Sequence, residues 1–139
     1  MNSWRTLKGK VRHKEPLKNY TTFRIGGEAK FFIEPEDAQD LKVLLKILKR
    51  RNIPFLLIGA GSNILVSDKG VRAAVLRLNS PFFRRISLHN HRLSAASGVS
   101  LSEIVRVSQR KGLSGLEFLS GIPGTLGGAL AMNAGIPQS

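Results

Sequence analysis

The chain has 139 residues, of which 22 are Lys or Arg and 9 are Asp or Glu, so its formal net charge is +13. Hydrophobic residues make up 42% and charged residues 22%, which fits a folded chain and excludes the composition of a disordered one. There is no cysteine, so disulfides, thiolate nucleophiles and cysteine-ligated metal sites are excluded. No signal peptide and no apolar run of about 18 residues is visible, and a cytoplasmic location is expected.

The first half of the chain begins with a polar, basic stretch, residues 1–18, which we expect to be a loosely held arm. The apolar run at 31–33 predicts a strand. A helix is predicted next, because Glu36 and Asp37 suit the positive end of a helix dipole and apolar residues follow at helical spacing. These apolar residues are Leu41, Leu44, Leu45 and Leu48.

Residues 55–58 form a continuous apolar run, which is typical of a strand buried on both faces of a parallel sheet. A strand, a helix and a strand at this spacing predict a right-handed crossover. Further strands are expected at 64–66 and 74–78. Residues 19–80 are therefore predicted to form a small parallel α/β subdomain.

The second half, residues 81–139, shows a different pattern. Apolar and polar residues alternate around a turn at His89 and Asn90, which predicts a hairpin. Ser100 and Glu103 form a capping-box pattern at the start of a helix that Gly112 ends. A short helix is expected after Thr125. This half is predicted to be an α+β, antiparallel subdomain.

The first candidate site is a glycine-rich turn between two apolar runs. Glycines allow a ligand to approach the backbone, and successive N–H groups can form a concave anion site. A Walker loop is excluded because no Lys follows the second Gly, and a Rossmann fingerprint is excluded because Ile stands where Gly or Ala is needed. An ordinary tight turn is the alternative. The candidate residues are Ile58, Gly59, Ala60, Gly61, Ser62, Asn63 and Ile64.

The second candidate site is the small-residue segment near the end of the sequence. A backbone with so few large side chains can pack closely against a flat ring or a diphosphate. Close packing of a helix on a sheet needs the same small residues and is the alternative. The candidate residues are Gly121, Ile122, Pro123, Gly124, Thr125, Gly127, Gly128, Ala129 and Asn133.

The remaining sequence patterns do not predict a further metal, catalytic or nucleic-acid site. His89 and His91 flank a turn without a nearby acid, so no metal site is expected. Glu117 is the sole acid in the last 36 residues, and a structural hydrogen bond is its expected role. The basic residues are dispersed with little aromatic interleaving, which disfavours a nucleic-acid surface, although their field favours a phosphate-bearing ligand. No catalytic residue is assigned.

Four segments in order carry a family resemblance. Residues 19–29, the loop at 59–66, the paired segments 112–117 and 120–129, and the Met-Asn-Ala-Gly at 132–135 resemble the UDP-N-acetylenolpyruvoylglucosamine reductases. These are FAD-dependent oxidoreductases of peptidoglycan precursor synthesis. The match runs from about residue 17 to residue 135.

The resemblance implies the vanillyl-alcohol-oxidase-type FAD-binding fold, with FAD held in a cleft by the candidate residues of both sites. It implies that NADPH passes hydride to FAD, which reduces an enolpyruvyl UDP-sugar. The family's catalytic Ser, Glu and Tyr-Arg pair follow the Asn-Ala-Gly step, and the ending at 136–139 differs from the family's Ala-Tyr-Gly. We therefore expect an FAD-binding part with an incomplete second subdomain and no turnover of its own.

Two other function classes remain open from the sequence. One is a stand-alone FAD-binding oxidoreductase module of the same fold with another substrate, against which the Arg-Ile-Gly-Gly at 24–27 counts. The other is a basic nucleic-acid-binding domain without a cofactor. A flavin absorbance spectrum would separate the second class from both flavoprotein classes.

Overall fold

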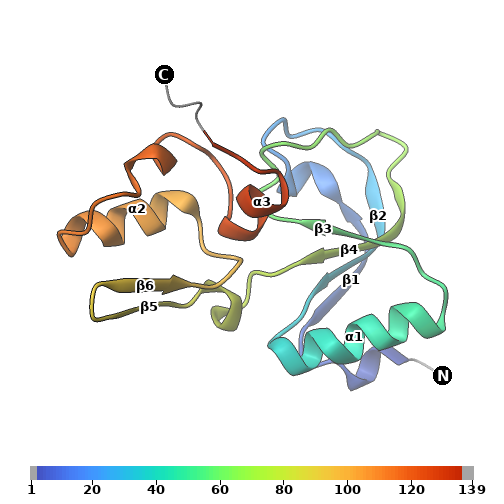
Figure 1. Ribbon diagram of the computed structural model, residues 1–139. Helices are drawn as coiled ribbons and strands as arrows, with labels where there is room; N and C mark the ends of the chain where they lie inside the picture. Colours follow the sequence, from blue (N-terminus) through green and yellow to red (C-terminus); the bar gives the residue numbers. More distant parts are fainter. Residues whose placement is uncertain (1–2, 136–139) are drawn as a thin grey trace.

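The structure, a computed structural model, describes residues 3–135 and contains two sheets (Figure 1). The first sheet has four strands in the order β1-β2-β4-β3, and the second has two, β5 and β6. The strands are β1 (Lys10–Pro16), β2 (Glu28–Glu34), β3 (Phe55–Ile58), β4 (Val71–Arg77), β5 (Ile86–His89) and β6 (Arg92–Ala95). The α-helices are α1 (Ala38–Arg50), α2 (Leu101–Arg110) and α3 (Leu126–Ala131), and short 3-10 turns span Ser3–Thr6, Leu17–Tyr20, Pro81–Arg84 and Glu117–Leu119.

The first sheet confirms the predicted crossover. Strands β2, β4 and β3 run parallel, and α1 connects β2 to β3. Helix α1 covers one face of the sheet, where Leu44 and Leu48 are buried against Ile33 and Leu76. The opposite face carries a second apolar cluster around Phe32 and its neighbours on β3, β4 and the Leu17–Tyr20 turn. The sheet thus buries apolar residues on both sides, as a parallel sheet requires.

The expectation of a loose basic arm is wrong for the described part of residues 1–18. Strand β1 pairs antiparallel with β2 over its whole length, with Arg12 opposite Phe32. Trp4 and Leu17, on either side of β1, are buried. The sequence of β1 looks like an arm because it forms one edge of the sheet, where charged side chains reach water and protect the free edge. Residues 1–2 and 136–139 lie outside the described part of the chain.

Strand β3 corrects a second expectation. It is the other edge of the sheet, so its residues are not buried on both faces: Phe55, Leu56 and Leu57 are 44%, 53% and 63% exposed. The strand expected at 64–66 is also wrong, because no residue there pairs with another strand. Ile64 and Val66 instead pack against the cluster around Phe32 from a loop.

The second half follows its local sequence signals. The predicted β5–β6 hairpin forms with Leu88 opposite Leu93, but it turns at Asn90 and His91, one residue later than expected, because His89 still pairs with Arg92. Both turn residues have positive φ, 44° and 62°, which is typical of a type I′ turn. Helix α2 begins at the Ser100 cap and packs with the Glu117–Leu119 turn over the hairpin. The boundary between the subdomains near Ser80 stays a prediction. No helix among residues 3–135 has the length and apolarity to cross a bilayer.

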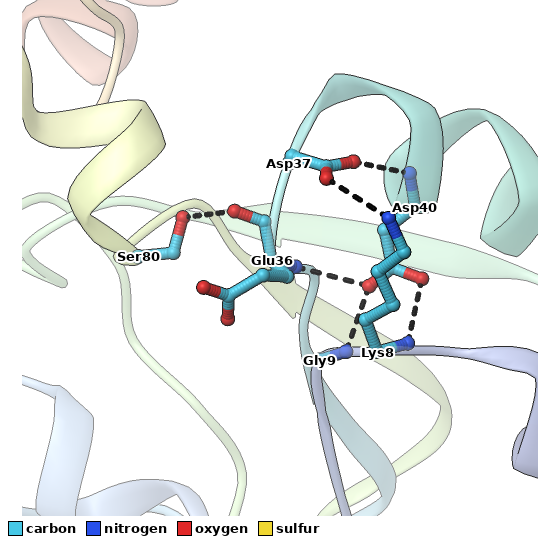
Figure 2. A network of polar contacts seen from close by, with 6 residues as sticks. All are labelled: Lys8, Gly9, Glu36, Asp37, Asp40 and Ser80. Atoms are coloured by element: carbon cyan, nitrogen blue, oxygen red, sulfur yellow. Dashed lines mark hydrogen bonds and ion pairs between the residues drawn. The ribbon is translucent and has the colours of Figure 1, made fainter.

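Asp40 in the first turn of α1 joins three segments of the first half (Figure 2). This residue is 3% exposed, and its carboxylate accepts hydrogen bonds from the backbone N–H groups of Lys8, Gly9 and Glu36 at 2.9–3.0 Å. Asp37 caps the same helix by accepting from the Asp40 N–H at 2.8 Å, and this bond, with the nearby Lys8 ammonium, lowers the pKa of Asp37. The chain before β1 is thereby fixed to the start of α1.

We expect Asp40→Asn to destabilise the protein by about 2 kcal/mol, because the amide has one acceptor oxygen and its NH₂ would face a backbone donor. Urea denaturation followed by circular dichroism measures the loss. Asp68→Asn is the control, since Asp68 is exposed. Equal midpoints for both variants would contradict the structural role assigned to Asp40.

Candidate functional site

The two glycine-rich segments, 61 positions apart in the sequence, lie against each other. The Ser62 hydroxyl donates a hydrogen bond to the Pro123 carbonyl oxygen at 3.1 Å. A Cβ added to Gly59 would lie 2.5 Å from Thr125 Oγ1, and one added to Gly124 would lie 3.6 Å from Ser62 Oγ. The loop after β3 therefore meets the loop before α3 at a distance that a side chain on Gly59 would not allow.

The loop after β3 is held from its other side by the turn that follows β1. Gly61 has a φ of +68°, and an added Cβ would collide with the carbonyl oxygen of Tyr20. The Gly61 carbonyl accepts a hydrogen bond from the Thr22 N–H at 3.0 Å. The positive φ and the close Tyr20 carbonyl explain why a glycine stands at position 61 without reference to a ligand.

Both loops contain backbone N–H groups that donate no hydrogen bond in the part of the chain that the structure describes. Within the described chain, the N–H groups of Ala60, Gly61, Ser62 and Asn63 donate no hydrogen bond to another residue. Among residues 3–135, the N–H groups of Gly124 and Thr125 in the neighbouring loop also donate no hydrogen bond. Consecutive unpaired amides on adjoining loops are donors that an oxyanion can accept from.

Helix α3 gives a mixed result for the second candidate segment. Thr125 caps the helix by accepting from the Gly128 N–H at 3.3 Å. Gly127 packs against the chain after β6: its N–H donates to the Ser97 carbonyl at 2.8 Å, and an added Cβ would lie 2.9 Å from the Ser97 Cβ. Close packing thus accounts for Gly127, and ligand contact by Gly127 and Gly128 stays a prediction.

The remaining candidate residues support the loops or flank them. Ile58 is buried, and Ile64 packs against the same cluster, so both anchor the first loop in the first half. Ile122 and Ala129 pack against the core of the second half. Asn133 lies exposed just after α3 with a φ of +48°. Their assignment to a ligand is also untested and stays a prediction.

One part of the site was not predicted from the sequence. Residues 21–25 form a turn in which Thr21 Oγ1 donates to the Ile25 carbonyl at 2.9 Å and the Arg24 N–H donates to the Thr21 carbonyl at 3.1 Å. This turn is tied to the first loop through Thr22. The sequence signal was present, because 19–29 is one of the resembling segments, but nothing in its residue types indicated a site.

Next to this turn, polar and aromatic side chains pack together on the second face of the sheet. The Tyr20 ring stacks on Phe32 with centroids 4.1 Å apart, and its hydroxyl donates to Glu15 at 2.6 Å. Burial, with that hydrogen bond, raises the pKa of Tyr20. Arg12 and Arg77 both pair with Glu34, at 2.6 and 3.7 Å. Both arginines therefore already have an acidic partner.

A family model described as an FAD binding domain matches residues 29–139. Among curated relatives, the UDP-N-acetylenolpyruvoylglucosamine reductase of Pelobacter propionicus is 47% identical over 129 residues, covering 93% of this chain and 43% of the relative. The reductase of the same name from Clostridioides difficile is 46% identical, covering 90% of this chain and 41% of the relative. The chain thus spans well under half the length of these curated relatives.

Two solved structures resemble the fold. The crystal structure of UDP-N-acetylenolpyruvylglucosamine reductase from Thermus caldophilus has a TM-score of 0.73 and 35% identity, covering 94% of this chain and 44% of that one. A solvent-stable cholesterol oxidase has a TM-score of 0.69 at 16% identity, covering 96% of this chain and 26% of that one, and shows the fold alone. The expected vanillyl-alcohol-oxidase-type fold is confirmed, α+β with one mainly parallel sheet, which has an antiparallel edge strand, and one antiparallel sheet. Together with the match over residues 29–139, these likenesses show that the chain belongs to the FAD binding domain family.

Proposed function

We propose that the loops at 59–63 and 121–125 hold the diphosphate of FAD between them. The observation that carries this proposal is the set of unused N–H groups on two loops that touch at Ser62 and Pro123. A diphosphate offers acceptor oxygens to such donors, and the absence of side chains on the glycines leaves the backbone within reach. The exposed Asn63 side chain adds an amide donor at the rim.

We further propose that these residues are the FAD-binding part of an NADPH-dependent reductase in the cytoplasm. Its reaction would convert UDP-N-acetylglucosamine enolpyruvate to UDP-N-acetylmuramate for peptidoglycan synthesis. The names of the relatives and the 47% identity over 129 residues support this assignment. FAD, when bound, supplies hydride transfer between NADPH and the enolpyruvyl group. The residues of the two loops bind and orient the cofactor.

No proton donor for that reaction is assigned within the described chain. Glu117, the acid nearest the second loop in sequence, accepts a hydrogen bond from the Gly115 N–H at 2.7 Å. This is the structural role expected for it from the sequence. The two histidines of the hairpin, His89 and His91, lie at an exposed turn. Residues 59–63 and 121–125 therefore form a cofactor-binding site.

Asn63→Ala should weaken FAD binding about tenfold, because it removes a side-chain donor to the diphosphate while leaving the loop backbone intact. Fluorescence titration of FAD with the purified chain measures the dissociation constant. Gln109→Ala removes the same amide group from an exposed position of α2 and should leave the constant unchanged. Identical affinities for the Asn63→Ala variant and the wild type would count against the placement of the diphosphate.

Gly61→Ala should destabilise the protein by at least about 1 kcal/mol in the absence of FAD, because the added methyl group meets the Tyr20 carbonyl and the positive φ disfavours a side chain. Thermal melting without ligand measures this effect. Gly112→Ala tests the backbone contribution alone, since its φ is also positive, +64°, while its added Cβ has nothing within 4 Å. A larger loss at Gly112 would contradict the close contact.

The 139-residue chain should not oxidise NADPH in response to the enolpyruvyl UDP-sugar, even with FAD added. Hydride transfer needs the ring, the substrate and a proton donor at reacting distance, and loss of even one electrostatic donor costs about a hundredfold or more. Absorbance of NADPH with and without substrate is the measurement. Substrate-dependent turnover would show that catalytic groups lie within these residues.

A further inference from the structure

Neither loop of the proposed diphosphate site contains a cation. Residues 58–64 and 121–133 include no Lys or Arg, although the chain carries 22 of them. Backbone N–H groups provide only partial positive charge, whereas a diphosphate carries about two negative charges near neutral pH. Any full positive charge that the protein adds to this site therefore comes from a segment outside the two loops.

The turn at 21–25 is such a segment. The Thr22 N–H donates to Gly61, at the centre of the first loop. Two residues later stands Arg24, a non-glycine residue with a φ of +54°. The Thr21–Ile25 and Arg24–Thr21 hydrogen bonds hold it in this conformation. A long charged side chain in a left-handed conformation is uncommon, and such strain is concentrated at functional positions.

Two arginines near the first loop are already paired with an acid. Arg77 lies opposite Ile58, at the start of the first loop, but it forms an ion pair with Glu34 and lies over the Tyr20 ring at 5.4 Å. Arg12 shares the same glutamate. Arg24 is exposed and forms no ion pair with residues 3–135. It is thus a full charge without an acidic partner, on a turn whose Thr22 N–H donates a hydrogen bond to the Gly61 carbonyl.

We propose that Arg24 supplies the positive charge that pairs with the diphosphate of FAD. This inference rests on the proposed function of the two loops and adds a residue from a third segment. The strained turn fixes the backbone position of Arg24, and its flexible side chain then reaches the anion. An arginine can donate two hydrogen bonds to phosphate oxygens from its planar guanidinium, which strengthens a site otherwise made of neutral donors.

The test is FAD titration at low and moderate salt for the wild type, Arg24→Asn and Arg24→Lys. Arg24→Asn removes the charge while keeping a residue that tolerates positive φ, so thermal stability should not fall. Its affinity should be about tenfold lower at low salt, with a weaker dependence on salt. Arg24→Lys keeps the charge and should bind within about threefold of the wild type. Arg24→Gly repeats the charge removal if the Asn variant is unstable.

Arg72→Gln is the matched control for the loss of one positive charge. Arg72 is exposed near the start of β4, whereas Arg77, which pairs with Ile58, lies at the end of this strand. FAD affinity of this variant should equal that of the wild type. An equal loss for Arg72→Gln and Arg24→Asn would attribute the effect to net charge and overturn the inference.

The remaining outcomes separate the inference from the proposed function. If Asn63→Ala weakens FAD binding and Arg24→Asn does not, the diphosphate site stands and the role of Arg24 is wrong. If Arg24→Asn and Arg24→Lys bind equally weakly, or the salt dependence is unchanged, shape rather than charge is responsible and the inference is again wrong. If the wild type binds no FAD, both the site and the role of Arg24 fall together.

Discussion

The contact between the loop after β3 and the loop before α3 is the constraint on which the rest of the site depends. At Gly59 the backbone of one half approaches the Thr125 hydroxyl so closely that no side chain fits between them. At Gly61 the same loop meets the carbonyl of Tyr20 from the other direction. A loop compressed from two sides can adopt few conformations. Its free N–H groups are therefore held in place before a ligand arrives, which reduces the entropy lost on binding.

Each half of the chain fixes one of the two loops in position. The first sheet fixes one loop by burying Ile58 and by stacking Tyr20 on Phe32, while Asp40 ties the chain before β1 to α1. The second half fixes the other loop through the Leu101 N–H, which donates to the Gly124 carbonyl at 3.0 Å. The proposed diphosphate site therefore depends on both halves, because each half supplies one of its two loops.

The parts of the fold that the sequence predicted correctly are those coded by neighbouring residues. The α1 stripe at Leu44 and Leu48, the Ser100 cap and the β5–β6 hairpin each depend on residues close in sequence. Leu45, predicted in the same stripe, is 38% exposed, and the hairpin turn lies one residue later than predicted. The errors at β1 and β3 concern which strands form the edges of the sheet, and that order is decided by pairing between distant segments. The charged residues of β1 therefore resemble an arm, and the apolar residues of β3 resemble a buried strand.

For the candidate site, closely spaced glycines predict a backbone that other atoms approach closely, and protein atoms do so at Gly59 and Gly61. The mutual contact of the two segments has no local pattern, and ligand binding there stays a prediction. The turn that carries Arg24 went unassigned for the same reason. Its connection to Gly61 is a backbone hydrogen bond between positions 22 and 61, and backbone partners leave no mark on residue type.

The position of the single tryptophan has a practical consequence for spectroscopy. Trp4 is 9% exposed and packs against Phe31 in the core beneath α1, and the single tyrosine, Tyr20, also belongs to the first half. The hairpin, α2 and α3 contain neither residue type. Intrinsic emission therefore reports the environment of the first sheet alone, and local opening of the second half would be silent to it. A probe such as an added tryptophan at exposed Phe118 would make the two halves separately visible.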